Sequence, residues 1–119
     1  FLTFLLLSLL PAPLATLFPY PTLFRSGDKV PHMGWNRVRQ TQPHPMWQNI
    51  ENEGRFSFVH SYFVQPDATN EIMGETEYPE PFCAALGHRN IFAVQFHPEK
   101  SQHNGLQLLS NFLSWDGQD

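Results

Sequence analysis

The chain has 119 residues, a length that suits one small domain. It carries 7 Lys and Arg against 11 Asp and Glu, a formal net charge of −4, so it lacks the basic field that nucleic-acid binding requires. One cysteine, Cys83, excludes an internal disulfide framework and fits a reducing compartment such as the cytoplasm.

Residues 1–28 differ in character from the rest of the chain, because residues 1–10 are almost wholly apolar and prolines interrupt the sequence that follows. A secretory signal peptide would need a positive n-region, which is missing, and a membrane-spanning helix would need a longer apolar run. Residues 17–26 look like a translated adapter joined to a truncated gene. We therefore expect residues 1–28 not to be native to the protein, the chain from Phe1 to be a fragment, and residues 29–119 to form the functional part.

Residues 31–36 read Pro-His-Met-Gly-Trp-Asn and place a glycine between two large apolar side chains. Gly34 frees the backbone for a turn, with Met33 and Trp35 on either side. Large apolar residues beside a glycine turn often anchor a protein partner, and ordinary core packing is the alternative. Residues 42–45 should form the loop that follows.

Residues 56–63 are rich in aromatic and β-branched residues and predict one strand. Within it, residues 58–62 read Phe-Val-His-Ser-Tyr, a run that can offer backbone groups and a hydroxyl to a small polar ligand. On this pattern alone, a buried aromatic strand with a hydrogen-bonded histidine is the favoured alternative. Residues 66–70 should form the next loop.

Two short apolar segments, residues 81–86 and 91–96, predict strands that a turn at residues 87–90 joins into a β-hairpin. Cys83 lies in the first segment, in the run Pro-Phe-Cys-Ala-Ala. A nucleophilic cysteine sits on a glycine-flanked elbow or at a helix N-terminus, where the thiolate is favoured. We therefore expect Cys83 to be a buried, unreactive thiol.

After Ser101 the apolar period changes to that of a helix. Ser101 is the expected N-cap, and residues 116–117 are the expected end. We expect this helix to lie on the sheet with its Leu and Phe side inward. The apolar residues of that side are Leu106, Leu109 and Leu113, with Leu108 and Phe112 beside them.

His97 and Glu99 stand two residues apart in the run Gln-Phe-His-Pro-Glu-Lys-Ser. Proline biases the chain toward extended backbone, in which residues i and i+2 point to one side. The two side chains should therefore meet, with the carboxylate orienting the imidazole, as in the base-and-orienter half of a nucleophilic triad. A strand-end histidine with a solvated glutamate is the common alternative. The six histidines show no metal-ligand spacing, so we expect no metal site.

Three motifs in this order, at residues 31–36, 58–62 and 94–101, resemble the glutaminase subunit of imidazole glycerol phosphate synthase, a class I, triad-type glutamine amidotransferase of histidine biosynthesis. The resemblance covers residues 29–113 and corresponds to the C-terminal half of the family domain. It implies an α/β fold with a mixed, mainly parallel sheet and flanking helices, incomplete in this chain. The Phe-His-Pro-Glu run alone marks the wider superfamily, whereas the first motif together with His-Pro-Glu-Lys-Ser is more specific to the histidine branch.

The resemblance implies a mechanism in which a cysteine thiolate attacks the side-chain amide of glutamine. His97 would act as the base that activates the thiol and then as the acid that protonates departing ammonia, and Glu99 would orient its imidazole. His60, Ser61 and Tyr62 would bind glutamine. No cofactor is implied.

The resemblance also implies a cytoplasmic heterodimer with a (β/α)8-barrel cyclase subunit. This subunit would receive the ammonia and make imidazole glycerol phosphate. No membrane association is implied. Met33 and Trp35 would face the barrel, and Lys100 would form an ion pair across the interface. In such enzymes glutamine cleavage is slow until the partner holds its own ligand.

The chain departs from the family pattern in three respects. The Gly-x-Cys-x-Gly nucleophile elbow and the oxyanion strand are missing, so we expect the chain alone to be inactive. Ser57 stands where the family usually has an aromatic residue near the interface. Residues 29–113 should expose strand edges and fold marginally. The alternatives are another triad-type amidotransferase, a secreted protein anchored by residues 1–10 and a non-catalytic partner-binding subunit.

Overall fold

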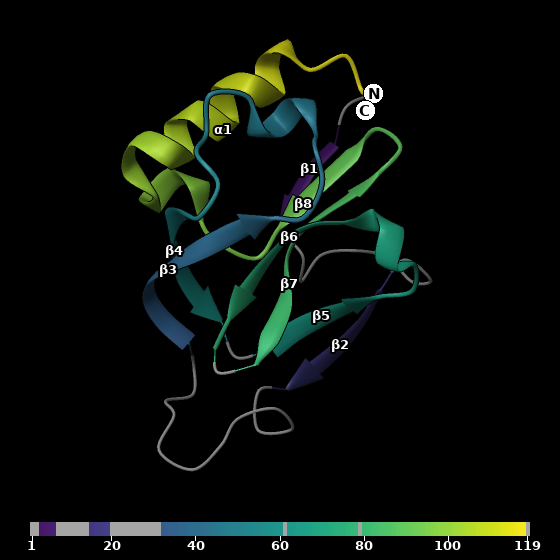
Figure 1. Cartoon of the computed structure of the whole chain (residues 1–119), viewed down its shortest axis with the longest axis vertical. Helices are drawn as coiled ribbons and strands as arrows, with labels where there is room; N and C mark the ends of the chain where they lie inside the picture. Colours follow the sequence, from purple (N-terminus) through teal and green to yellow (C-terminus); the bar gives the residue numbers. More distant parts are fainter. Residues whose placement is uncertain (1–2, 7–14, 20–31, 61, 79, 119) are drawn as a thin grey trace.

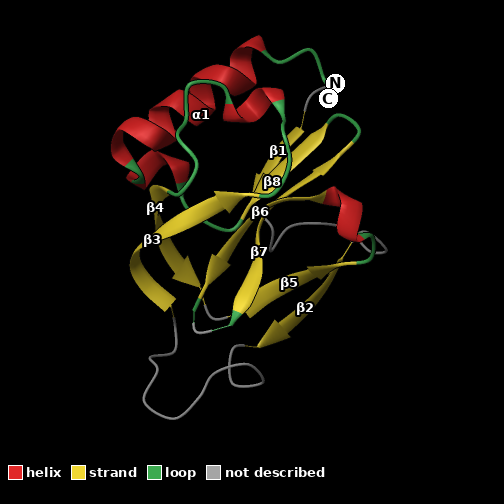
Figure 2. Cartoon of the chain, viewed as in Figure 1, coloured by secondary structure: helices red, strands yellow, loops and turns green. Residues whose placement is uncertain are grey.

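The computed structural model describes residues 3–6, 15–19, 32–60, 62–78 and 80–118, which form a mixed β-sheet with a helix packed on one face (Figure 1 and Figure 2). The strands are β1 (Thr3–Leu6), β2 (Ala15–Pro19), β3 (His32–Gln40), β4 (Gly54–His60), β5 (Tyr62–Pro66), β6 (Ile72–Glu77), β7 (Pro81–His88) and β8 (Ile91–Val94). The helices are the short 3-10 helices η3 (Pro45–Trp47), η4 (Thr69–Glu71) and η5 (Pro98–Lys100) and the α-helix α1 (Gln102–Ser114).

The strand order along the sheet is β1-β8-β7-β6-β3-β4, and β5 pairs with both β7 and β2. β1 runs parallel to β8, whereas the other described pairs are antiparallel. The sheet is therefore mixed, as the resemblance implied, with antiparallel pairs predominating in the described residues. β1 and β2 lie within residues 1–28 and pair with edges of β8 and β5, so these two edges are not open in this chain (Figure 1).

The main core lies between the sheet and α1 and is rich in aromatic rings. β4 alternates, because Phe56 and Phe58 are buried whereas Ser57 is half-buried and Val59 is exposed. The ring centroid of Phe56 lies 4.1 Å from that of Phe96, just beyond β8. Buried aromatic pairs add about 0.5–1.5 kcal/mol beyond their area. This contact therefore joins β4 to the end of β8, next to the candidate site.

The single strand predicted over residues 56–63 is wrong, because two strands occupy this region. β4 ends at His60 and pairs with β3, whereas β5 begins at Tyr62 and pairs with β2 and β7. Strand propensity is equally high on both sides of residue 61. The change is visible only in the partner strands, which are formed by residues distant in the sequence.

The β-hairpin of β7 and β8 is confirmed, with residues 89–90 in the turn between the antiparallel strands. β8 ends at Val94, before the predicted end at Phe96, because the chain bends there. The Gln95 N–H still donates to the carbonyl of Ala84 at 2.8 Å, so the two segments stay in contact beyond the strand.

The sequence pattern missed β3 and β6. Residues 31–36 were expected to contain a turn at Gly34, but described residues 32–40 form a strand. Gly34 has φ +121°, a conformation that glycine alone adopts readily, and it still faces Phe58 of β4. Pairing with β4 and β6 thus outweighs the weak local preference of this segment.

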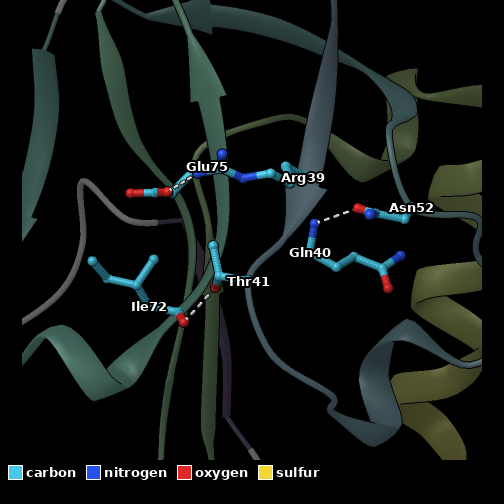
Figure 3. A network of polar contacts seen from close by, with 6 residues as sticks. All are labelled: Arg39, Gln40, Thr41, Asn52, Ile72 and Glu75. Carbon is cyan, nitrogen blue, oxygen red and sulfur yellow. Dashed lines mark hydrogen bonds and ion pairs between the residues drawn. The ribbon is translucent and has the colours of Figure 1, made fainter.

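Polar contacts join the end of β3 to β6 (Figure 3). Arg39 forms an ion pair with Glu75, its partner in the sheet register. The Thr41 hydroxyl donates to the carbonyl of Ile72 at 2.7 Å. Figure 3 also shows the backbone N–H of Gln40 donating to the side-chain oxygen of Asn52, in the loop before β4. These contacts place the β3–β4 pair at the end of the sheet.

Helix α1 occupies the predicted segment, and its predicted inner side is right for Leu108 and Phe112, which pack in or against the core, but wrong for Leu106 and Leu113. Leu106 and Leu113 are 66% and 85% exposed, whereas Leu108 is fully buried in the core. The buried side runs through Gly105, Leu108 and Asn111. In the described part of the chain, no helix has the length and the apolar character needed to cross a membrane.

Asn111 explains why the helix turns this side inward. Its amide donates to the carbonyls of Met46 at 2.8 Å and Gln48 at 2.7 Å, around η3. A buried amide with such partners stabilises this packing, whereas an unpaired one would be costly. The leucine pattern alone cannot report these bonds, because their acceptors lie 63 and 65 residues away in the chain.

The assignment of the buried helix side predicts different costs for two leucines of α1. We expect Leu108→Ala to lower the free energy of unfolding by about 2–5 kcal/mol, because it leaves a cavity in the core. Leu113→Ala, the matched control at an exposed position, should change it by no more than about 0.5 kcal/mol. Urea unfolding followed by circular dichroism measures both. Equal losses would contradict the assignment.

Candidate active site

The imidazole of His97 meets the carboxylate of Glu99, as the sequence spacing predicted. His97 Nδ1 lies 2.9 Å from Glu99 Oε1. The route differs from the prediction, because only His97 has extended backbone, at φ −102° and ψ 101°. Pro98 then starts the 3-10 helix η5, and this turn brings the carboxylate back to the ring. The pair has the geometry of a base with its orienting group.

The turn that carries His97 is bonded to β4. The His97 N–H donates to the carbonyl of Ser57 at 2.9 Å. The Ser57 N–H donates to Ser101 Oγ at 2.9 Å, and this hydroxyl donates to the carbonyl of His97 at 2.6 Å. The fixed position of His97 therefore depends on the backbone of Ser57 and on the buried Ser101 side chain.

Gly105 allows α1 to begin directly against this turn. A Cβ at this position would lie 1.8 Å from the carbonyl oxygen of Pro98. The Gly105 N–H also donates to the carbonyl of Ser101 at 3.2 Å. Sequence reasoning missed this residue, because an isolated glycine in a helical pattern does not reveal which backbone approaches it.

The predicted N-cap residue Ser101 stands at the N-cap position, but its side chain makes no cap hydrogen bond. Its hydroxyl instead joins Ser57 to His97. The residue was therefore placed correctly and its role was predicted wrongly.

The electrostatic setting of Glu99 favours its ionised form. Partial burial is the largest single influence and raises the pKa of the carboxyl. A backbone hydrogen bond within Glu99, the bond with His97, and the charges of His97 and Lys100 together outweigh it, so the pKa lies below its ordinary value of 4.5. A carboxylate that stays ionised can orient the imidazole and stabilise its protonated form.

The three predicted glutamine-binding residues are only partly described. Ser61 lies outside the described residues, and Tyr62 is the first residue of β5. His60, the last residue of β4, is buried, with ring centroids 5.6 Å from Phe58 and 5.2 Å from Phe82. His60 stands about 10 Å along β4 from Ser57, at about 3.3 Å per residue. The binding role of this segment remains a prediction.

The outer face of the β3–β4 pair carries three exposed apolar side chains. Met33, Trp35 and Val59 are 65%, 48% and 43% exposed. Met33 faces Val59 in the register, and Trp35 faces Ser57. Val59 was missed by the sequence analysis, although its position opposite Met33 follows once the register is known. The predicted interface residue Lys100 is exposed on η5, and the residues on either side of η5, His97 and Ser101, are bonded to Ser57 of β4.

Cys83 is a buried thiol, as predicted. Its Sγ contacts the carbonyl oxygen of Ala85 at 3.3 Å, and burial raises its pKa to about 12. A thiol with this pKa supplies almost no thiolate near neutral pH, so Cys83 is unsuited to nucleophilic attack. Within the described residues, no three or more His, Cys, Asp or Glu side chains gather into a metal-binding group.

Comparisons with known sequences agree with the motifs. Residues 15–115 match the sequence model of the family described as glutamine amidotransferase class-I. The imidazole glycerol phosphate synthase subunit HisH of Thiobacillus denitrificans is 61% identical over 88 residues, 74% of this chain and 39% of that protein. The subunit HisH of Neisseria meningitidis serogroup A is 56% identical over 87 residues, 73% of this chain and 41% of that protein. The chain thus spans about two fifths of the length of these curated relatives.

A solved structure agrees with the fold. A protein from Thermoplasma acidophilum that is assigned as part of a GMP synthase superposes with a TM-score of 0.62. The match covers 84% of this chain and 47% of that one, at 17% identity, so it concerns the fold alone. Together with the family match it confirms the class I amidotransferase fold that the resemblance implied.

The lowered pKa of Glu99 predicts a pH dependence. The folded pKa lies below the unfolded value, so the pair stabilises the fold above the unfolded pKa, near 4.5, and this contribution is lost as pH falls through the folded pKa. Because the Glu99 side chain is 58% exposed, the contribution is screened and small. In a ¹³C-carboxyl NMR titration we expect a Glu99 midpoint below 4.5.

His97→Ala should raise this midpoint toward 4.5, because it removes the hydrogen bond and the charge that favour the carboxylate. His103→Ala, which removes an exposed histidine on α1, is the matched control and should leave the midpoint unchanged. A midpoint that is the same in the wild type and in His97→Ala would show that the pair does not form.

Proposed function

Because this chain belongs to the class I glutamine amidotransferase family, we propose that it is part of the glutaminase subunit of imidazole glycerol phosphate synthase, which releases ammonia from glutamine for histidine biosynthesis. The observation that carries the proposal is the His97–Glu99 pair, with Nδ1 and Oε1 2.9 Å apart on a turn bonded to β4. The identity to HisH subunits over about three quarters of the chain supports this branch of the family.

In the proposed reaction, His97 moves protons and Glu99 holds it in place. Since Nδ1 faces Glu99, Nε2 is the nitrogen that accepts the proton of the attacking thiol. The thiolate adds to the amide carbon of glutamine, and the protonated imidazole then gives its proton to the departing ammonia. Water hydrolyses the resulting thioester to glutamate, with His97 as the base that takes the proton from water and returns it to the thiol.

The proposal assigns the attacking thiol to a cysteine outside these 119 residues. Cys83 is unsuited to this role, because burial raises its pKa to about 12. The same proposal gives His60, Ser61 and Tyr62 the task of holding glutamine, and it requires no metal or other cofactor.

The proposed partner is a (β/α)8-barrel cyclase subunit, in a cytoplasmic heterodimer with lyase activity. Exposed Met33 and Trp35 on β3 supply an apolar surface suited to such an interface, and exposed Lys100 on η5 supplies a positive charge. Ammonia released near His97 would pass to the barrel and not to solvent. This arrangement is supported by the position of β4, which pairs with β3 on one edge and is bonded to the His97 turn on the other. Only one strand therefore separates β3 from the turn.

Loss of the imidazole tests the proposed chemistry. In the full-length protein, where the chain is joined to the segment with the nucleophile, we expect His97→Ala to lower glutaminase kcat by about 10²–10⁴-fold, the usual contribution of a general acid–base group. Binding to the cyclase subunit should be unchanged. His103→Ala is the matched control and should keep full activity. Near-wild-type turnover of His97→Ala would remove the assignment.

If the wild-type full-length protein binds the cyclase subunit but releases no ammonia from glutamine, a non-catalytic partner-binding subunit is the better description. The unsuitability of Cys83 as a nucleophile is the observation that keeps this second candidate in view. Coupled detection of glutamate and ammonia distinguishes the two.

A second prediction concerns the partner surface. We expect Trp35→Ala to weaken binding of the cyclase subunit by about 2 kcal/mol or more, as for buried aromatic anchors of interfaces. Lys100→Ala should weaken it less and should reduce its dependence on salt. The control Leu113→Ala removes an exposed apolar side chain of α1, outside this surface, and should leave the affinity unchanged. Unchanged affinity of Trp35→Ala, measured by calorimetry, would contradict the assignment of this surface.

A further inference from the structure

We propose that Ser101 is a positioning residue for His97, and that its hydroxyl fixes the turn from which the imidazole acts. The inference rests on the proposed function, because the position of His97 matters for turnover only if this residue transfers protons. It concerns a residue that does not touch the substrate and acts through the main chain of His97.

The Ser101 hydroxyl acts both as an acceptor and as a donor toward backbone groups of other residues. Ser101 Oγ accepts from the Ser57 N–H at 2.9 Å and donates to the His97 carbonyl at 2.6 Å. The residue is only 1% exposed, so water is a poor substitute for either bond. The hydroxyl is therefore a bridge between β4 and the turn, and not a surface group.

The Ser101 hydroxyl does not cap helix α1, although Ser101 precedes this helix. A serine at an N-cap normally accepts a hydrogen bond from a backbone N–H of the first helical turn. Ser101 makes no such bond, although it occupies the N-cap position of α1. Its side chain thus serves the turn before the helix in preference to the helix itself.

Hydrogen bonds hold both peptide groups that flank the Cα of His97, and Ser101 supplies one of them. The N–H on one side donates to the Ser57 carbonyl at 2.9 Å, and the carbonyl on the other side accepts from Ser101. With these two groups held, the imidazole moves only by rotation of its own side chain, and Glu99 Oε1 limits that rotation at 2.9 Å from Nδ1. Loss of the Ser101 hydroxyl removes the link from this carbonyl to β4. The carbonyl then keeps only the bond from the Lys100 N–H, at 3.1 Å, which lies within the turn itself.

The expected effect is on turnover and not on the binding of glutamine. A displacement of about 1 Å at a reacting group can lower the rate by about 10²-fold. Ser101 lies behind His97, bonded to backbone, so its removal disturbs the proton-transfer geometry without removing a contact to the substrate. A purely structural role would instead lower the thermal midpoint and leave kcat unchanged in the folded protein.

The experiment compares Ser101→Ala, which deletes the hydroxyl, with Ser101→Thr, which keeps it, and with Ser110→Ala as the matched control on the exposed side of α1. In the full-length protein, we expect Ser101→Ala to lower glutaminase kcat by up to about 100-fold with KM unchanged. Ser101→Thr should restore most of the turnover, and Ser110→Ala should match the wild type.

A second readout does not require activity. In the 119-residue chain, Ser101→Ala should raise the ¹³C-carboxyl NMR midpoint of Glu99 toward 4.5, because a loosened turn populates the His97–Glu99 bond less. Should Ser101→Ala fail to fold, Ser101→Cys decides in its place, because it retains the side-chain volume but forms only weak hydrogen bonds.

An unchanged kcat together with an unchanged Glu99 midpoint in a folded variant would overturn the proposal. So would equal losses in Ser101→Ala and Ser101→Thr, since the hydroxyl would then not be the cause. If the wild-type full-length protein has no glutaminase activity, the proposed function fails, and the Glu99 midpoint still decides whether Ser101 positions His97.

Discussion

The two main-chain hydrogen bonds of Ser57 join the parts of this chain that bear on its chemistry. The carbonyl accepts from His97, and the N–H donates to Ser101. Because the N–H and the carbonyl of Ser57 both point toward the turn, they do not bond to Trp35, the residue opposite on β3. Ser57 and Trp35 are therefore a non-hydrogen-bonded antiparallel pair, in which the facing side chains lie closest together. Ser57 thus faces the proposed base with its backbone and the proposed partner surface with its side chain.

This arrangement gives the proposed base and the proposed interface one common support. Exposed Met33 and Trp35 lie on β3, the His97 turn is bonded to the opposite edge of β4, and the two strands are paired over most of their length. A displacement of β4 would therefore move both the partner surface on β3 and the turn that carries His97. Both bonds of Ser57 come from its backbone and do not depend on its side chain.

Close packing behind the turn makes this support rigid. The rings of Phe56 and Phe96 join β4 to the chain that leads into His97, and Gly105 lets α1 begin against the carbonyl of Pro98. A site held by packed strands and a helix keeps its geometry better than one on a free loop. Cys83 lies in β7, buried in a second cluster with Val64, so nothing in this frame brings a reactive thiol to His97.

The sequence by itself determined the features that depend on near neighbours, whereas the tertiary structure decided those that depend on distant ones. The spacing around Pro98 predicted that His97 and Glu99 meet, although a 3-10 turn and not extended chain brings them together. Periodicity located α1, and two apolar segments with a turn between them located the β7–β8 hairpin, because these features follow from residues a few positions apart. The role of Ser101 could not be read in this way, since its bond to Ser57 spans 44 residues. The buried side of α1 likewise depends on backbone acceptors that only the folded chain brings to Asn111.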